Sequence, residues 1–406
     1  MKVAVLGATG SIGQNTLNIA AAFPGKLEIT GLTCRQNVEQ LAKDIARFQP
    51  LVVAVAGPNE QKKLSGLLTE MGIKSPDILH GPQGQAQAAS QSGADIVVSA
   101  IVGEAGLIPT HAAINKGQRV ALANKESLVM AGDILIPLAR KTKAQITPVD
   151  SEHSAIFQVL GGLTAPNPVR RLILTASGGP FRGMKKADLE KVTLAATLNH
   201  PRWSMGPKIS CDSATMMNKG LEIIEAHHLF GIPYDRLEVL VHPQSVVHSI
   251  VEYMDGAQLM QCGPTDMRQA IAYALSYPAR WPLLSGNDEA HCEGLRPLDL
   301  AAVASSCGKG HLAFEEPDYE TFPALELAVK AGKAGGTVPA IMNGANEEAV
   351  KLFLDGAIRY VDIVRLVDQV MQRLPGTLIR DIEQLLLVSE EARRLARSMA
   401  VKISSI

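Results

Sequence analysis

The chain has few cysteines, and their spacing argues against a disulfide framework. The five cysteines, Cys34, Cys211, Cys262, Cys292 and Cys307, form no C-x-x-C pair, and their number is odd. Such a set suits reduced thiols better than the paired cysteines of a small secreted domain. We therefore expect a cytoplasmic protein.

A strong net charge and long apolar runs are also lacking. The net charge of −1 argues against a general nucleic-acid-binding protein, so any phosphate site must be local. No uninterrupted apolar run approaches the ~20 residues of a membrane-spanning helix. A strand is expected from Val3 onward, which leaves no room for a leader peptide. With 406 residues, of which 46% are hydrophobic, we expect two or three globular domains.

The first expected strand, Lys2 to Leu6, is followed at once by a glycine-rich turn. The turn reads Gly7-Ala8-Thr9-Gly10-Ser11-Ile12-Gly13 and leads into a helical pattern. A dinucleotide site requires this context, because glycines let the backbone approach a pyrophosphate at the helix N-terminus. The sequence favours nucleotide binding here over a purely structural tight turn.

The end of the second expected strand, Leu27 to Leu32, bears on which nucleotide binds. An NAD site usually carries an acid there, whereas this chain has Thr33-Cys34-Arg35-Gln36-Asn37. An arginine without an acid suits the 2′-phosphate of NADP. The alternative is that Arg35 is a solvated loop cation.

Alternating strand and helix patterns continue to about residue 150. The later expected strands are Val52–Val55, Ile78–Leu79, Ile96–Ile101, Val120–Ala123 and Ile146–Val149. This alternation predicts an α/β domain, residues 1–150, with a Rossmann-like, doubly wound parallel sheet. Asn124 and Lys125 follow one of these strands at the ligand-facing edge. Lys125 suits a pocket cation, and Asn124 equally suits a helix cap.

Two carboxylates, Asp150 and Glu152, end the last of these strands, with Ser151 between them. In extended backbone they would point the same way, and they would repel each other unless a proton or cation lay between them. Oxygen ligands favour a hard ion such as Mg²⁺ or Mn²⁺. The alternatives are a solvated strand end and a helix N-cap at Asp150 or Ser151.

The pattern changes after residue 151, and we expect a catalytic α/β domain over residues 151–285. Within it, residues of about 178–207 form a loop in which Trp203 lies among Pro, Gly and polar residues. This loop is either a lid that excludes water or a surface loop anchored by one aromatic side chain. His248 is a second-rank catalytic candidate, because a lone histidine is more often satisfied by hydrogen bonds.

The segment from Lys208 to Glu225 is dense in polar side chains. Ser213, Asn218 and Lys219 offer a hydroxyl, an amide and a cation, which together suit a phosphate monoester. Glu222 lies three residues after Lys219, on the same face of a helix, and suits a third metal carboxylate. The alternative is an amphipathic helix that exposes both charges.

The remainder of the chain is expected to form a connection followed by a helical domain. Residues 286–318 are rich in Gly, Pro and polar residues and suit a connection. In residues 319–406 apolar positions recur at i, i+3, i+4 and i+7, which predicts a small helical bundle.

Six motifs occur together and in order: G-A-T-G-S-I-G at 7–13, L-A-N-K-E-S-L at 122–128, P-V-D-S-E-H at 148–153, T-A-S-G-G-P-F-R at 175–182, D-S-A-T-M-M-N-K-G-L-E at 212–222 and H-P-Q-S-V-V-H-S at 242–249. Over nearly its whole length the chain resembles the 1-deoxy-D-xylulose 5-phosphate reductoisomerases. The resemblance implies conversion of that substrate to 2-C-methyl-D-erythritol 4-phosphate, in non-mevalonate isoprenoid synthesis. It also implies NADPH, a divalent cation (Mg²⁺ or Mn²⁺) and a homodimer.

The resemblance further implies roles for the matching residues. The metal ligands would be Asp150, Glu152 and Glu222. The substrate contacts would be Lys125 and Ser151 at the hydroxylated end, Ser177, His200, Ser213, Asn218 and Lys219 at the phosphate, and Trp203 and Met205 on a flexible lid. The NADPH contacts would be Thr9, Gly10, Ser11, Ile12, Asn37, Asn124 and Gly206, with Glu126 nearby.

Three segments depart from the family pattern. Arg202 stands where the family commonly has asparagine, and the proline of Gly263-Pro264-Thr265-Asp266-Met267 is displaced by one position. Arg35 and Gln36 stand in a cofactor loop usually of A-G-K-N type, as candidates for 2′-phosphate recognition. These departures bear on the lid and on cofactor affinity, and they leave every metal ligand in place.

Two other functions remain open. A metal-independent NADPH dehydrogenase of a small phosphorylated or acidic substrate would keep its activity in a chelator. An NADPH-binding sensor or scaffold would bind the nucleotide without turning over a sugar phosphate.

Overall fold

The structure is a computed structural model that describes residues 1–162, 168–284, 292–306 and 311–403. Contacts divide the chain into two compact units. The first unit comprises Met1–Ser127, Leu135–Ser154 and Asp266–Pro297, and the second comprises Leu128–Ile134, Ala155–Thr265 and Leu298–Ile406. Cys307 and parts of the expected 286–318 connection, residues 286–291 and 307–310, lie outside the described residues.

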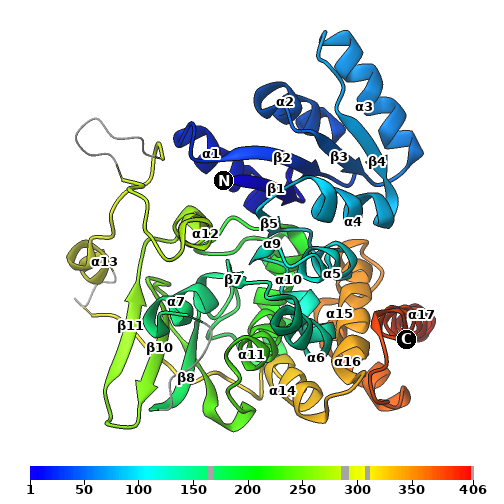
Figure 1. The fold of residues 1–406 in the computed structure, drawn as a ribbon. Helices are drawn as coiled ribbons and strands as arrows, with labels where there is room; N and C mark the ends of the chain where they lie inside the picture. The colour runs from blue at the N-terminus through cyan, green and yellow to red at the C-terminus, as the bar shows by residue number, and fades with distance from the viewer. Residues whose placement is uncertain (163–167, 285–291, 307–310, 404–406) are drawn as a thin grey trace. The chain divides into compact units, whose positions relative to one another are not determined.

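The first unit contains a parallel sheet of seven strands in the order β4-β3-β2-β1-β5-β6-β7 (Figure 1). Its strands are β1 (Lys2–Leu6), β2 (Glu28–Thr33), β3 (Val52–Val55), β4 (Asp77–His80), β5 (Ile96–Ser99), β6 (Arg119–Leu122) and β7 (Ile146–Pro148). Each predicted strand is found, with ends within two residues of those expected. The α/β fold class is confirmed.

Helices cover both faces of this sheet. Alternate residues of β3 divide between two apolar cores: Val53 and Val55 pack with one set of helices, and Val52 and Ala54 pack with Ala88 of α4. A parallel strand that is apolar on both faces is typical of a doubly wound sheet. The helices are α1 (Ser11–Ala22), α2 (Val38–Phe48), α3 (Pro58–Glu70), α4 (Gly81–Gln91), the 3₁₀ turn η1 (Glu104–Gly106), α5 (Leu107–Asn115) and α12 (Met267–Ser276).

Helix α12 comes from much later in the sequence, yet it completes one of these cores. Its Ile271 and Leu275 are buried in the same cluster as Leu17 of α1. Nearby, the rings of Phe23 and Trp281 lie 5.5 Å apart. Residues near 270 to 281 therefore complete the apolar core on the side of the sheet that α1 covers.

The strand order reverses at β1, which has β2 on one side and β5 on the other. The crevice beyond the carboxyl ends of strands at such a reversal is where ligands bind in open α/β sheets. The glycine-rich turn follows β1 directly, so the sequence places it at this point.

Two long helices, α6 (Lys125–Thr142) and α7 (Ser151–Leu160), have residues in both units. The predicted first boundary, residue 150, lies close to the change of unit after Ser154. Residues from Asp266 to Pro297 group with the first unit rather than with the segment before them.

The second unit has a four-stranded sheet in the order β11-β10-β8-β9. Strand β8 is parallel to β9 and antiparallel to β10. The strands are β8 (Val169–Ala176), β9 (Leu237–Val241), β10 (Val247–Tyr253) and β11 (Gln258–Cys262). The apolar runs Arg171–Thr175, Leu237–Val241 and Val247–Tyr253 predict the first three. Strand β11 is not predicted, because its residues are mostly exposed and do not alternate in polarity.

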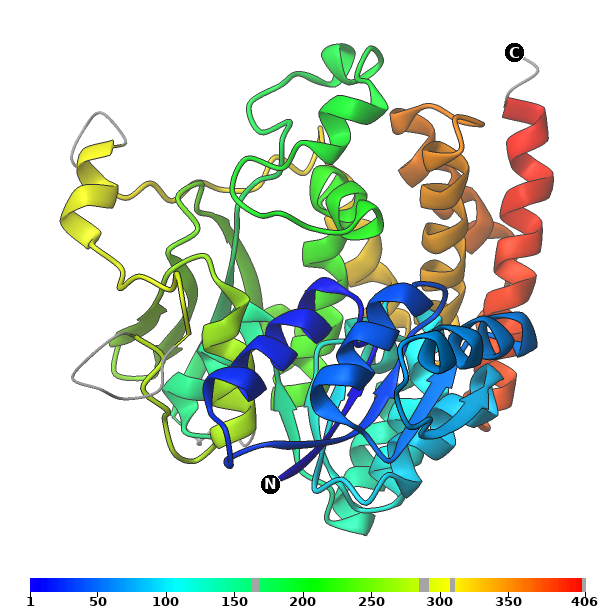
Figure 2. The same cartoon turned by 90° about the horizontal axis from the view of Figure 1, so that it is seen from above.

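The C-terminal part of the second unit is helical, which confirms the predicted bundle. Helix α15 packs against both α16 and α17, and the three helices are seen side by side in Figures 1 and 2. The helices of this unit are α8 (Lys186–Leu189), α9 (Leu194–Leu198), α10 (Pro207–Thr215), α11 (Met217–Phe230), η2 (Tyr234–Arg236), α13 (Leu300–Ser306), α14 (Ala324–Ala334), α15 (Val338–Leu354), α16 (Tyr360–Arg373) and α17 (Ile382–Ile403). None of the described helices is long and apolar enough to cross a bilayer.

Candidate functional site

The glycine-rich turn is held tightly at the reversal point of the first sheet. Gly7 has φ +77°, and a Cβ at this position would lie 2.6 Å from the carbonyl oxygen of Ala100. The amides of Gly7 and Ala8 donate to the hydroxyl and carbonyl oxygens of Thr33, at 2.9 and 2.7 Å. Only glycine fits position 7, because any Cβ would meet backbone there.

The candidate residues Thr9, Gly10, Ser11 and Ile12 lie where this turn enters α1. Gly10 is the N-cap residue of α1, and Gly10 and Ser11 are exposed. The first amides of a helix have no partner within the helix. This end of α1 therefore presents donors suited to an anionic group.

Replacing Gly7 with alanine should destabilise the protein by at least about 1–2 kcal/mol and weaken NADPH binding, because the left-handed backbone and the Ala100 carbonyl both oppose a Cβ. Gly66→Ala is the matched control. Gly66 lies on the exposed face of α3, and a Cβ there would have no atom within 4 Å, so this change should stabilise by up to about 1 kcal/mol. Denaturant unfolding and NADPH titration of both variants test the pair, and equal effects would contradict the assignment.

The candidates for 2′-phosphate recognition follow β2. Arg35, Gln36 and Asn37 are all exposed. The side chain of Asn37 caps α2 by accepting from the amide of Gln40 at 3.1 Å. The guanidinium of Arg35 is thus accessible to solvent at the ligand-facing edge of the sheet.

Asn124, at the end of β6, has a structural role that engages both ends of its amide. Its Oδ1 accepts from the amide of Ser127 at 3.1 Å and caps α6. Its Nδ2 donates to the carbonyl oxygens of Ile101 and Gly103, at 2.6 and 2.8 Å, and to Glu126 at 3.1 Å. The helix-cap interpretation of Asn124 is confirmed, and the same bonds fix the loops that follow β5 and β6.

Lys125 and Asp150 form an ion pair of 2.5 Å, and their side chains are only 11% and 15% exposed. Lys125 is the first residue of α6, and Asp150 immediately precedes α7. The ends of β6 and β7 therefore bring together two of the residues that the sequence singled out.

The expectation that Asp150 and Glu152 share an extended strand was wrong. Strand β7 ends at Pro148, and α7 begins at Ser151, with the amide of Ser154 donating to the carbonyl of Asp150 at 2.8 Å. Asp150 is thus at the helix start, as one of the alternatives held. Glu152 is in the first helical turn, where its carboxylate accepts from the hydroxyl of Ser151 at 2.5 Å.

In the second unit, Ser177 and His200 form a hydrogen-bonded pair of 2.9 Å between Oγ and Nε2. The Nδ1 atom of His200 accepts from the amides of Trp203 and Arg202, so Nε2 carries the proton and donates to Ser177. Burial lowers the pKa of His200 to about 4, which agrees with a neutral ring. The amide of Gly179 also donates to Ser177 Oγ, so the hydroxyl proton of Ser177 is left to donate to a ligand.

The segment 178–207 contains the short helices α8 and α9, and Trp203 and Met205 are half-buried. The ring of Trp203 lies 6.4 Å from that of His248. Arg202 is exposed, and its Nε donates to the carbonyl of Pro243 at 3.1 Å. Gly206 is exposed at the N-cap of α10.

The predicted phosphate cradle lies on two helices, α10 and α11, that meet at Met216. Met216 has φ +65°, a rare backbone for a residue with a side chain, and it separates Ser213 from Asn218 and Lys219. The Lys208–Glu225 segment is therefore two helices rather than one. Ser213 and Asn218 are half-buried, so both remain accessible.

The charged pair on α11 is buried, which rules out the alternative of a solvated helix face. The ammonium of Lys219 contacts the carboxylate of Glu222, and their side chains are 5% and 1% exposed. Asn218 Nδ2 donates to the other oxygen of Glu222 at 2.5 Å. A buried carboxylate needs such partners to offset its lost hydration. Desolvation of the two charges can still cost more free energy than their attraction returns.

His248, on β10, is 6% exposed. Burial lowers the pKa of His248 and the nearby charge of Lys219 lowers it further, while backbone hydrogen bonds with Gly263 and Pro264 oppose the shift. The ring is therefore mostly neutral at neutral pH. Its backbone hydrogen bonds agree with the view that a lone histidine is usually satisfied structurally.

One buried polar cluster beside the cradle was not found from the sequence. Lys208 and Asp212 form an ion pair of 2.8 Å on α10, and Asp212 is 1% exposed. The sequence does contain a sign of this ion pair, because Lys208 and Asp212 are four residues apart in a segment expected to be helical.

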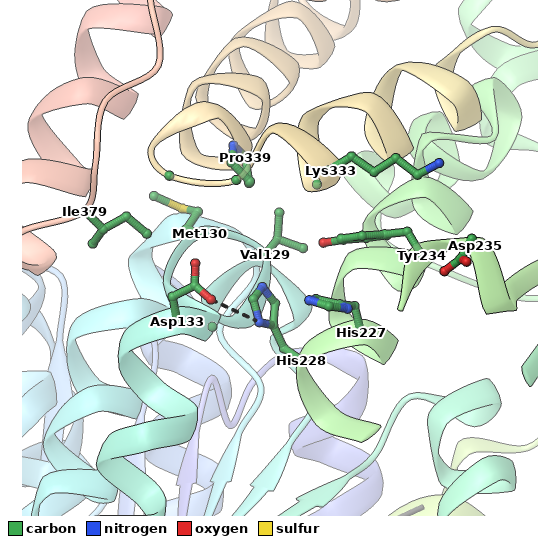
Figure 3. Close-up of a pocket in the computed structure, with 14 residues that line it drawn as sticks. Val129, Met130, Asp133, His227, His228, Tyr234, Asp235, Lys333, Pro339 and Ile379 are labelled. Carbon is green, nitrogen blue, oxygen red and sulfur yellow. Dashed lines mark ion pairs between the residues drawn. The ribbon is translucent and has the colours of Figure 1, made fainter. Parts of the chain in front are cut away.

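The opposite end of α11 lines a cavity of about 400 Å³ that contains none of the predicted site residues (Figure 3). His228 points toward Asp133 across 3.9 Å, and His227 stacks on Tyr234. Burial lowers the pKa of His228 to about 4, so this contact is not a charge pair at neutral pH. The cavity is also lined by Asp235 and Lys333, and it lies apart from the cradle residues of α11.

Three family models match the chain in order along its length. The 1-deoxy-D-xylulose 5-phosphate reductoisomerase model matches residues 3–132. Its C-terminal domain model matches residues 146–230, and the DXP reductoisomerase C-terminal domain model matches residues 262–395. The chain belongs to the 1-deoxy-D-xylulose 5-phosphate reductoisomerase family. It is therefore an oxidoreductase.

Individual reductoisomerases agree with this membership. The protein from Pelodictyon phaeoclathratiforme (strain DSM 5477 / BU-1) is 49% identical over 400 residues, which cover 98% of each chain. The protein from Moorella thermoacetica (strain ATCC 39073 / JCM 9320) is 45% identical, with 99% of each chain covered. The solved reductoisomerase of Zymomonas mobilis, in complex with NADPH, has a TM-score of 0.86 and 42% identity over 98% of each chain.

A second solved reductoisomerase, in complex with NADPH, fosmidomycin and magnesium, has a TM-score of 0.89 and 39% identity over 99% of each chain. The similarity thus includes the sheet of the first unit, the cradle helices and the C-terminal helices of this reductoisomerase-family chain.

Proposed function

We propose a division of roles among the residues of this chain in the reaction of its family. The reaction is the NADPH- and magnesium-dependent conversion of 1-deoxy-D-xylulose 5-phosphate to 2-C-methyl-D-erythritol 4-phosphate, in non-mevalonate isoprenoid synthesis. The observation that carries this function is identity of 49% over 98% of the chain with a curated reductoisomerase.

The first unit holds NADPH. The pyrophosphate is placed at the glycine turn and the start of α1, where Thr9, Gly10, Ser11 and Ile12 lie. The exposed Arg35, Gln36 and Asn37 receive the adenosine 2′-phosphate. Asn124 fixes the neighbouring loops, and the family resemblance assigns further NADPH contacts to Glu126 and to Gly206, a residue of the second unit. When bound, NADPH supplies the hydride that reduces an aldehyde.

Asp150, Glu152 and Glu222 hold the divalent cation. Three carboxylates form an all-oxygen donor set, which suits Mg²⁺ and equally Mn²⁺. The observed partners fit this role: Lys125 faces Asp150, Ser151 contacts Glu152, and Asn218 orients Glu222. When bound, the cation supplies a positive charge that stabilises the negative charge developing on adjacent substrate oxygens.

The second unit holds the substrate phosphate. The hydroxyl of Ser177 donates to it, and neutral His200 keeps that hydroxyl oriented. Ser213, Asn218 and Lys219 supply a hydroxyl, an amide and a charge. These contacts fix the end of the substrate that does not react, so that binding energy there orients the carbon skeleton that rearranges.

The remaining roles concern the hydroxylated end of the substrate and the lid. Lys125 and Ser151 contact the substrate hydroxyl groups, and His248 is a secondary candidate beside Trp203. Trp203 and Met205, on segment 178–207, cover the substrate and exclude water while the aldehyde is reduced. The functional domains are residues 1–150, 151–285 and 319–406, with 286–318 as the connection.

The homodimer and the cytoplasmic location are also proposals. Among the described strands, β11 is at the edge of its sheet and exposes Leu259 and Met260, and an edge strand of this kind can pair with a second chain. Cys34, Cys211 and Cys292 are buried free thiols, which suits a reducing compartment.

NADPH oxidation, followed by its absorbance, tests the function. It should require both 1-deoxy-D-xylulose 5-phosphate and added Mg²⁺ after chelation, and Mn²⁺ should also restore it. Oxidation that survives the chelator would instead support a metal-independent dehydrogenase. NADPH binding without oxidation would contradict the roles given to the second unit.

A further inference from the structure

We propose that Asn346, in the C-terminal helices, is a positioning residue for the phosphate cradle, acting through Asp212. This inference rests on the proposed function, because it concerns how Ser213 is held in the cradle. Asn346 lies on α15 and is fully buried, and its Nδ2 donates to Oδ1 of Asp212 on α10 at 2.8 Å.

Both chain neighbours of Ser213 are fixed by C-terminal helices. Asp212, on one side, is held by Asn346 of α15. Ala214, on the other side, accepts a hydrogen bond through its carbonyl oxygen from the hydroxyl of Tyr360, on α16, at 2.6 Å. With one hydrogen bond anchoring each of its chain neighbours, Ser213 is fixed in backbone position and in rotation about the helix axis.

A third contact fixes Ser213 against the loop that carries Ser177. Gly179 has φ +69°, and a Cβ there would lie 2.7 Å from the carbonyl oxygen of Ser213. The Ser177 loop is therefore in direct contact with the backbone of α10. Any shift of α10 changes the separation between the hydroxyls of Ser177 and Ser213, which the phosphate must bridge.

The anchor matters because the joint between the two cradle helices is strained. Met216 adopts the left-handed conformation, which brings its Cβ close to the following carbonyl oxygen. Relaxation at this joint would rotate Ser213 relative to Asn218 and Lys219. The contacts of Asn346 and Tyr360 oppose that relaxation.

The buried amide of Asn346 is itself costly. Its Oδ1 has no hydrogen-bond partner among the described residues, although it is buried. A leucine would avoid that unsatisfied group, but it would also remove a donor from the buried carboxylate of Asp212. The hydrogen bond to Asp212 therefore accounts for an asparagine at this position.

The same helix supplies a closely matched control, Asn343. Asn343 is also fully buried on α15, and its Oδ1 likewise has no partner among the described residues. Its Nδ2 donates to Met130 and Glu347, neither of which belongs to α10. Asn343 and Asn346 therefore differ mainly in what their amide nitrogens hold.

The experiment compares Asn346→Leu and Asn343→Leu in the full-length enzyme. Asn346→Leu should raise the KM for 1-deoxy-D-xylulose 5-phosphate about tenfold, change kcat by less than about threefold and leave the KM for NADPH unchanged. Asn343→Leu should leave all three constants within about twofold. Thermal unfolding of both variants measures the loss of stability. A purely structural role predicts no selective rise in the KM for 1-deoxy-D-xylulose 5-phosphate in either variant.

Inorganic phosphate provides a probe that does not depend on catalysis. As a competitor of the substrate, it should bind about tenfold more weakly to Asn346→Leu than to the unaltered enzyme and to Asn343→Leu. Tyr360→Phe, which removes only a hydroxyl, should act in the same direction with a smaller effect, and it serves if Asn346→Leu does not fold.

Unchanged substrate KM and phosphate affinity in both Asn346→Leu and Tyr360→Phe would overturn the positioning role while leaving the function intact. If inorganic phosphate does not compete with the substrate in the unaltered enzyme, the proposed phosphate site is wrong, and this inference is wrong with it. The two failures are therefore distinguishable.

Discussion

Glu152→Gln should lower kcat by about 10²–10³-fold while leaving the Kd for NADPH nearly unchanged. Glutamine has nearly the same shape but no negative charge, so it is a poor ligand for a hard cation. The nucleotide is assigned to the glycine turn and to the end of β2, which this substitution does not touch. Steady-state kinetics at saturating Mg²⁺ and a fluorescence titration with NADPH measure the two quantities.

Glu70→Gln is the control for this substitution. Glu70 is an exposed carboxylate at the end of α3, so its loss should change neither kcat nor NADPH binding. Near-normal turnover in Glu152→Gln would remove Glu152 from the set of metal ligands. A parallel loss of NADPH affinity would show instead that the substitution disturbs the first unit.

Lys219→Met should lower kcat/KM by about 10²–10³-fold and also lower the thermal stability. Lys219 is buried and contacts Glu222, so its removal leaves a buried carboxylate without its cation. Breaking such a pair typically costs about 3–5 kcal/mol. The substrate phosphate loses its charged partner in the same step. Substrate kinetics and thermal unfolding measure both effects.

The double variant Lys219→Met/Glu222→Gln separates stability from function. With both charges removed, thermal stability should recover most of what Lys219→Met loses, whereas activity should stay low because the cradle cation and a metal ligand are both absent. Lys351→Met, an exposed lysine on α15, should behave as the unaltered enzyme. Recovery of activity in the double variant would contradict the roles assigned to both residues.

The sequence predicts the parts of the fold whose pattern is set by local chemistry. The buried strands of the first sheet, such as β1 and β3, are β-branched runs between helical patterns, and parallel strands covered on both faces read as continuous apolar segments. The placement of Lys219 and Glu222 on one helix face was also predicted, because residues three apart lie on the same side of a helix.

Other features depend on tertiary contacts and left no clear local signal. A methionine at position 216 gives no sign of left-handed backbone, so the break between α10 and α11 was not predicted. The helix start at Ser151 replaced the expected extended backbone, because Asp150 caps a helix as readily as it ends a strand. The partnership of Asp212 with Asn346 joins residues 134 positions apart, which one sequence does not reveal.

The late position of α12 in the sequence has a consequence for synthesis of the protein. The last strand of the first sheet ends at Pro148, yet the helix that completes the α1 face ends at Ser276. At a translation rate of about 5–20 residues per second, the apolar surface around Leu17 and Phe23 stays without α12 for roughly 6–25 s after β7 has been synthesised. The nascent nucleotide-binding sheet therefore needs protection from aggregation during that interval, and it reaches its final packing only after most of the substrate-binding segment has left the ribosome.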